Sequence, residues 1–136
     1  MRPIDFAKAF GVGVLVMVLN MALLFGLGFI YDTVIEPGRT AAYYQGVYPK
    51  IGAWSAPIGA IVLLFLAAWG SGVRRPARNP YVFGALVYAS YFGVDVALTL
   101  GMGPLATLLV PPFLISLGGG AVATVAGAAL ARSSGK

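Results

Sequence analysis

The chain has 136 residues, of which 60% are hydrophobic and only 10% charged, and its mean hydropathy is +0.90. This composition is too apolar for a water-soluble domain of this length and indicates an integral membrane protein. The sequence contains no His and no Cys, which excludes imidazole bases, thiolate nucleophiles, disulfides and the commonest ligands of transition metals. We therefore expect no metal site and no bound cofactor.

Four apolar stretches are long enough to cross a bilayer, which takes about 20 residues at a rise of about 1.5 Å per residue. They are residues 9–31, 51–73, 81–101 and 105–131. We predict an all-α membrane protein, a single domain of four transmembrane helices in an up-down bundle. The first stretch is too long for a signal peptide and no small-residue cleavage motif follows it, so we expect it to stay in the mature protein.

The basic residues predict the orientation of the helices. Of the nine Lys and Arg residues, only Arg39 and Lys50 lie between the first and second stretches, and the others precede the first, follow the second or follow the fourth. The positive-inside rule then places both termini in the cytoplasm of a multi-pass protein of the bacterial inner (plasma) membrane. The basic residues are distributed among the loops and termini and form no continuous basic surface. The net charge of +5 therefore does not indicate a nucleic-acid partner.

Aromatic residues mark the expected membrane surfaces, where amphipathic rings are enriched. Trp54 and Trp69 lie near the two ends of the second stretch, about 22 Å apart along a helix. Four tyrosines are expected to cluster at the outer surface: Tyr31, Tyr43, Tyr44 and Tyr48. There, residues 40–48 are predicted to form a short helix lying on the membrane, which serves either as an aromatic belt or as a lid.

The fourth stretch carries small residues at steps of four, which let helices approach closely. One row consists of Gly119, Ala123, Gly127 and Ala131, and a second row of Ser116, Gly120, Thr124 and Ala128. Two such faces indicate packing against two neighbours, either two helices of the same bundle or one of them in another subunit. Besides the lipid bilayer, we expect a homo-oligomer or a membrane-protein partner. The glycine run at 118–120 lies inside an apolar helix and follows no strand, so it is not a phosphate loop.

The third stretch has one polar side. It consists of residues at steps of three or four, namely Gly84, Tyr88, Tyr91, Asp95 and Thr99. An intramembrane carboxylate costs at least about 2.5 kcal/mol on insertion, so Asp95 should face the bundle interior, a partner or a water-filled cavity. Three interpretations stay open: a site for a proton, cation or small substrate, an ion pair with Arg39 or Lys50, or an exposed edge position.

The tight turn after the third stretch predicts what lies opposite Asp95, because residues equally far from a hairpin turn lie at similar depth. Asp95 lies eight residues before Gly103 in the turn, and Pro111 lies eight residues after it. If the fourth helix runs through Pro111 and Pro112, the carbonyls of Thr107 and Leu108 lose their helical partners and the helix kinks. Carbonyl oxygens beside a carboxyl group suit a protonated Asp95 or a bound cation, and broken helices recur in transporter sites.

Asn20 is the other polar residue deep in an apolar stretch. It lies about 16 Å below the outer end of its helix, against about 9 Å for Asp95. It is expected either to make an interhelical hydrogen bond without further function or to continue a polar path inward from Asp95. The candidate binding residues are Asp95, Tyr91, Tyr88, Thr99, Asn20 and Thr107.

One segment resembles a known family. Tyr88-Ala89-Ser90-Tyr91, followed by Asp95, Ala97 and Gly103-Pro104-Leu105, is similar to the Tyr-Ala-Thr-Tyr segment and the following hairpin of a bacterial membrane family, domain of unknown function 2177. The segment covers about a fifth of the chain, which has Phe92 where the family carries an acid and Val110-Pro111-Pro112 where the family carries an Asp. The resemblance implies a four-helix inner-membrane protein with no known activity, and it transfers no site residues.

Two functional hypotheses follow from these residues. In the first, the protein is a small transporter-like or ligand-binding bundle in which Asp95 titrates or binds a cation, and a cavity reaches that residue. In the second, it is a non-catalytic accessory or scaffold subunit that docks a larger membrane partner through its small-residue helix faces. We do not expect an enzyme, because a hydrolase with two carboxylates would need Asp95 from two subunits to meet near an axis.

Overall fold

The computed structural model describes residues 1–135, without the side chain of Thr107. Within that range every regular element is helical, and four helices are long and apolar enough to cross a membrane. The prediction of an all-α protein with four helices of the length and hydropathy of membrane spans is therefore confirmed. The elements are α1 (Pro3–Ile30), the π-helical turn η1 (Tyr31–Ile35), α2 (Ala41–Arg74), α3 (Pro80–Met102), the 3-10 turn η2 (Leu105–Leu109) and α4 (Pro111–Ser134).

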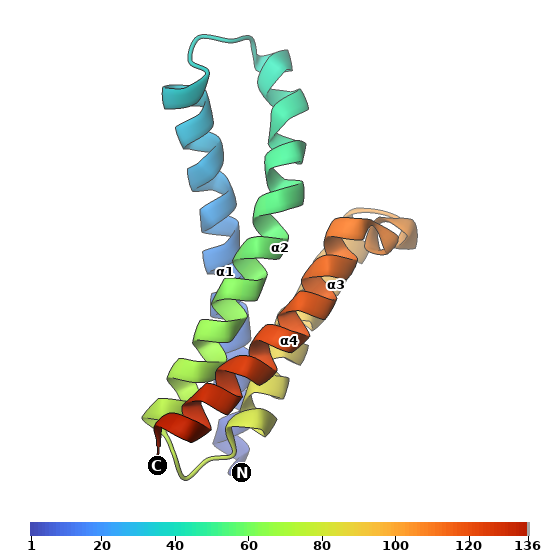
Figure 1. The fold of residues 1–136 in the computed structure, drawn as a ribbon. Helices are drawn as coiled ribbons and strands as arrows, with labels where there is room; N and C mark the ends of the chain where they lie inside the picture. Colours follow the sequence, from blue (N-terminus) through green and yellow to red (C-terminus); the bar gives the residue numbers. More distant parts are fainter. Residues whose placement is uncertain (136) are drawn as a thin grey trace.

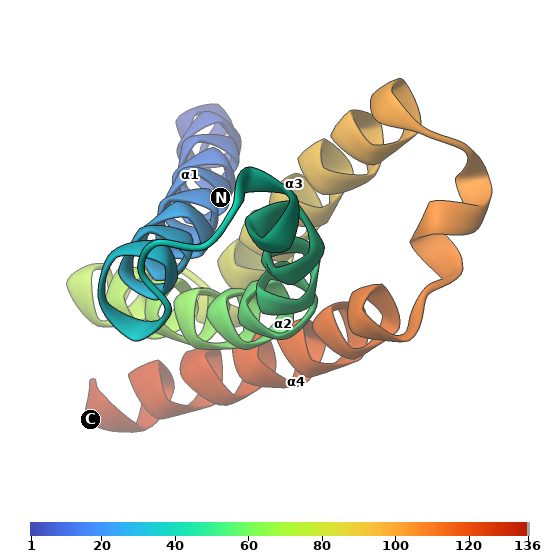
Figure 2. The ribbon, with the colours of Figure 1, turned by 90° about the horizontal axis from the view of Figure 1, so that it is seen from above.

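The helices form two antiparallel hairpins, α1–α2 and α3–α4. Near the chain termini the hairpins pack side by side, and both termini lie at the same end as the α2–α3 loop (Figure 1). Toward the opposite end they diverge, and the tip of α3–α4 extends away from the α1–α2 loop when the molecule is seen from above (Figure 2). The bundle is thus closed at the terminal end and splayed at the other.

The fourth helix begins at Pro111 and not at residue 105, so the predicted kinked helix through the prolines is wrong. The chain leaves α3 at Met102, makes the η2 turn and is extended at Val110, with φ −79° and ψ 146°. Proline fits the first turn of a helix, where the missing N–H would have no partner, and it forces an extended conformation on the residue before it. Pro111 and Pro112 therefore start α4 without interrupting it.

The second helix begins at Ala41, ten residues earlier than predicted. The Thr40 hydroxyl caps it by accepting a hydrogen bond of 3.3 Å from the Tyr43 amide. Residues 41–48 are the first turns of α2, which continues through Pro49, so the predicted separate helix on the membrane surface is wrong. As a result Trp54, which is 72% exposed, lies well inside α2 and does not mark its end.

The four outer tyrosines gather at the splayed end, where they tie α1 to α2. The Tyr48 hydroxyl donates a 2.6 Å hydrogen bond to the Asp32 carboxylate, and the Tyr44 hydroxyl donates one of 2.6 Å to the Glu36 carbonyl. The remaining two, Tyr31 and Tyr43, have their hydroxyl oxygens 3.0 Å apart. These contacts hold the loop between the two helices, which favours a structural role over that of a lid.

Both small-residue faces of α4 pack against helices of the same chain. In the first row, a Cβ added at Gly127 would overlap the carbonyl oxygen of Phe65 on α2, so the backbones are in direct contact. In the second row, Thr124 packs against α3, since a Cβ added at Gly84 would come within 3.0 Å of its Cγ2 atom. Of the two arrangements that the sequence left open, the structure has the one with both neighbours in one bundle.

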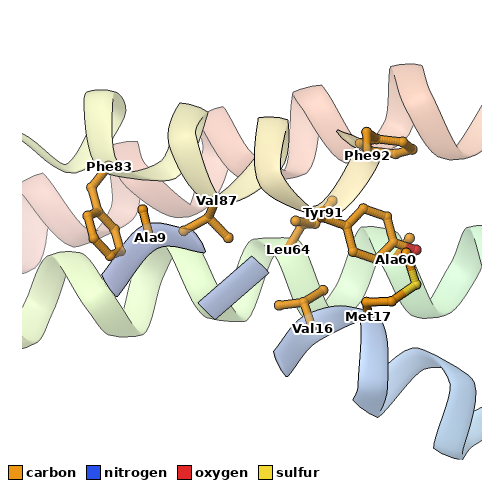
Figure 3. Packing of buried hydrophobic residues seen from close by; sticks show 9 residues of the cluster. All are labelled: Ala9, Val16, Met17, Ala60, Leu64, Phe83, Val87, Tyr91 and Phe92. Carbon is orange, nitrogen blue, oxygen red and sulfur yellow. The ribbon is translucent and has the colours of Figure 1, made fainter. Parts of the chain in front are cut away.

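The hydrophobic core lies in the closed half, between α1, α2 and α3. Its buried members, shown in Figure 3, are Ala9, Val16, Met17, Ala60, Leu64, Phe83, Val87, Tyr91 and Phe92. Close approach of α1 and α3 depends on Gly13, since a Cβ there would lie 2.9 Å from the Val87 carbonyl oxygen. Tyr91 is at the end of this core that faces the splayed half, and the candidate site begins there.

Candidate functional site

A cavity of about 230 Å³ lies where the two hairpins begin to diverge, and all four helices line it. Its walls are Met17, Asn20, Met21, Leu24, Gly52, Ala56, Pro57, Tyr91, Asp95, Pro112, Phe113 and Ser116. Four of these residues bring polar side chains, namely Asn20, Tyr91, Asp95 and Ser116. The cavity therefore combines a few polar groups with apolar and aromatic walls, as small-ligand sites do.

Asn20 joins three helices at this cavity. Its amide nitrogen donates one hydrogen bond of 3.1 Å to the Ala56 carbonyl on α2 and another of 2.9 Å to the Tyr91 hydroxyl on α3. The side chain is 7% exposed, and Gly59 on α2 leaves it room, because a Cβ there would overlap its Oδ1 atom. The predicted interhelical hydrogen bond is thus formed. Oδ1 itself has no hydrogen-bond partner among the described residues.

Tyr91 and Asp95 lie one turn apart on α3 and both line the cavity. Because the Tyr91 hydroxyl accepts its hydrogen bond from Asn20, its own proton is free to be donated. Asp95 is partly exposed and lies about 10 Å from the outer end of α3. The cavity is thus lined by the Asp95 carboxylate and the Tyr91 hydroxyl from α3 and by the Asn20 amide from α1.

The Asp95 carboxylate has no ion-pair partner in the part of the chain that the structure describes. Arg39, one of the two cations considered for it, instead pairs with Glu36 at 3.0 Å and lies over the Tyr43 ring. The glutamate raises the pKa of Arg39 through a hydrogen bond and its charge. Lys50 forms no ion pair with a described residue either, so the structural alternative for Asp95 is not observed.

The other residues of the predicted polar side do not line this cavity. The Tyr88 hydroxyl donates a 2.9 Å hydrogen bond to the Leu117 carbonyl on α4, and Tyr88 is not among the residues that line the cavity. Thr99 is not among the lining residues, and the side chain of Thr107 lies outside the described structure. Their roles in binding stay predictions.

Prolines contribute to the cavity, although not as the sequence suggested. Pro112 lines it from the first turn of α4, where a proline frees no helical carbonyl, so the expected freed carbonyls of Thr107 and Leu108 are not part of the site. Pro57 lines it from the middle of α2, where a proline leaves the carbonyl of Ala53 without its helical N–H partner. A proline within an apolar stretch was the available signal for this position.

A second polar cluster, not anticipated from the sequence, lies at the terminal end. The Arg78 guanidinium is 3.6 Å from the Asp5 carboxylate, donates a 3.0 Å hydrogen bond to the Ser71 carbonyl and lies 3.3 Å from the centre of the Phe83 ring. Burial lowers the pKa of Arg78, and the nearby carboxylate opposes this shift. The cluster ties the α2–α3 loop to the start of α1, so this arginine has a structural role besides setting topology.

Comparison with family models, curated proteins and solved structures finds no match for the chain.

Proposed function

We propose that this small multi-pass membrane protein binds a small monovalent cation at Asp95, in exchange for a proton, and moves it across the bilayer. The observation that carries the proposal is the unpaired Asp95 carboxylate in a cavity lined by all four helices. A charged group at membrane depth without a partner is costly, and such groups mark ion pathways. Uptake of either a proton or a cation removes that cost.

The remaining polar groups suit a cation that keeps part of its hydration shell. Asn20 supplies an amide oxygen without a partner, and the hydroxyls of Tyr91 and Ser116 supply further neutral oxygens. With about 30 Å³ per water in the liquid, 230 Å³ is enough for a monovalent cation and several waters. Within the described residues no three carboxylates come together, which favours a monovalent over a divalent cation.

The splayed half offers the route to this site. Above the cavity the α1–α2 and α3–α4 hairpins diverge, and below it the buried side chains of Val16, Leu64 and Val87 close the bundle. With the predicted orientation, the open side faces the outside of a bacterial inner membrane. Release to the cytoplasm then requires the two hairpins to rock against each other, as bundles do in alternating access.

We propose no enzymatic activity. A hydrolase of the kind considered above needs two carboxylates, and among the described residues Asp95 is the one carboxylate that lines the cavity. Cation binding at Asp95 also needs no larger partner. The accessory-subunit hypothesis needs free small-residue faces, and the packing of Gly120 and Gly127 of α4 within this chain supports the cation site in preference to it. A homo-oligomer remains compatible with the proposal, since lipid-facing surfaces of α1 and α2 are large and apolar.

Reconstitution tests the proposal directly. Proteoliposomes that enclose a pH-sensitive dye are given an inward gradient of Na⁺, K⁺ or tetramethylammonium. Entry of a cation in exchange for a proton at Asp95 makes the interior alkaline for wild type, whereas Asp95→Asn behaves like protein-free liposomes. Glu36→Gln is the matched control, because that carboxylate lies in the α1–α2 loop and should leave the flux unchanged. A flux that survives in Asp95→Asn, or no flux with any of the three cations, contradicts the proposal.

A further inference from the structure

A second hollow lies between α1 and α2 in the closed half, away from Asp95. It has a volume of about 640 Å³. Along its length the walls are apolar and include Leu15, Leu19, Leu63 and Leu66, and at its terminal end the lining residues are cationic. Leu15 is 54% exposed and Leu66 is 45% exposed, so the apolar part of the groove opens laterally toward the surrounding lipid.

The cations at the end of this groove are largely uncompensated. Lys8, Arg74 and Arg75 line it and make no ion pair with any residue in the range 1–135. Arg78 lines it too, but its guanidinium is already engaged by Asp5. A cluster of three free cations at the end of two membrane-spanning helices lies at the depth of lipid headgroups, where it attracts anionic lipid.

The middle of the groove is left open by glycines. Gly11 on α1 and Gly70 on α2 both line it, and a Cβ added at either would meet no described atom within 4 Å. These two positions therefore leave room in the groove between the cations and the leucines. A glycerol backbone and the start of an acyl chain need this kind of space.

We propose that the α1–α2 groove binds an anionic phospholipid. The phosphate contacts Lys8, Arg74 and Arg75, through the charge-assisted hydrogen bonds that phosphate oxygens accept from cationic side chains. One acyl chain lies along the leucines of the groove. The headgroup charge supplies the complement to the three free cations, and a zwitterionic lipid, whose own ammonium group would meet them, does not.

Native mass spectrometry tests this site with two lipids of identical acyl chains, phosphatidylglycerol and phosphatidylcholine, presented in equal amounts. Wild type should retain phosphatidylglycerol preferentially, and the triple variant Lys8→Gln, Arg74→Gln, Arg75→Gln should lose that preference by roughly tenfold or more. The control variant Arg2→Gln, Arg132→Gln removes two cations from the same end that do not line the groove, and it should keep the preference. Equal losses in both variants would mean attraction by surface charge alone and would overturn the proposal.

A glycine pair tests the apolar part of the site independently of charge. Gly70→Leu fills the groove, whereas Gly26→Leu places the same side chain on α1 outside it, and neither Cβ meets a described atom within 4 Å. Both variants should therefore fold, which circular dichroism checks. Gly70→Leu should lower retention of phosphatidylglycerol severalfold and Gly26→Leu should not. Unchanged retention in Gly70→Leu would show that no lipid occupies the groove.

Discussion

Replacing Asn20 by alanine tests the polar link between the core and the cavity. The amide donates one hydrogen bond to the Ala56 carbonyl and one to the Tyr91 hydroxyl, and it is buried. Interhelical hydrogen bonds in membranes are worth about 0.6 kcal/mol on average and about 1.7 at most. Loss of both predicts a decrease of about 1–2 kcal/mol in the free energy of unfolding. Unfolding by SDS in mixed micelles, followed by the fluorescence of the two tryptophans, measures it.

A double-mutant cycle with Tyr91→Phe assigns this energy to its two parts. Phenylalanine keeps the buried ring and removes only the acceptor of one hydrogen bond, so Tyr91→Phe should cost less than Asn20→Ala. The coupling energy between the two changes should be about 0.6 kcal/mol, the value of one interhelical bond. A coupling energy of zero, or a larger cost for Tyr91→Phe than for Asn20→Ala, would refute the view that the hydrogen bond between Asn20 and Tyr91 links α1 to α3.

Two pairs of variants and one single variant test the packing and the loops. Gly127→Ala should destabilise the bundle because its Cβ would overlap backbone of α2, whereas Gly118→Ala, in open space on the same helix, should stabilise it by up to about 1 kcal/mol in SDS unfolding. Arg78→Gln should lower the thermal unfolding temperature more than Arg75→Gln, since only the first removes an ion pair. Tyr44→Phe should speed hydrogen exchange in the α1–α2 loop, because its hydroxyl donates to a loop carbonyl. An equal effect within either pair, or unchanged exchange in the loop, would count against these contacts.

Hydropathy was sufficient to predict the number of helices but not where α2 and α4 begin. Residues 41–48 include several tyrosines and a glutamine, which resemble a membrane-surface segment, and Pro49 resembles a helix break. A helix can absorb a proline at the cost of one backbone hydrogen bond, and here tyrosine contacts to the preceding loop hold its first turns. The apolar stretch around Pro111 and Pro112 is continuous, so hydropathy alone indicates interior positions for prolines that in fact start α4.

Helical spacing predicts which residues of the candidate site share a face of one helix, but it does not predict which residues of two different helices meet. Tyr91 and Asp95 share a face because four residues are close to one helical turn. Tyr88 lies on nearly the same side of α3 as Asp95 but about 10 Å further from the outer end, where its hydroxyl reaches the Leu117 carbonyl on α4, so it is excluded from the cavity by depth. The contact between Asn20 and Tyr91 depends on the close approach of α1 and α3 at Gly13, and no spacing within either helix could reveal that pairing.

The most direct test of cation binding at Asp95 is the thermal stability of purified wild type and Asp95→Asn in detergent, with and without Na⁺, K⁺ or tetramethylammonium, over the pH range in which both stay folded. A cation that binds only the folded state adds about 1.4 kcal/mol at ten times its Kd. If Asp95 binds a cation, at least one of these cations stabilises wild type, and Asp95→Asn is folded but insensitive to it. If Asp95→Asn is strongly destabilised at every pH and no cation affects wild type, the carboxylate is a structural group and cation binding at Asp95 is refuted.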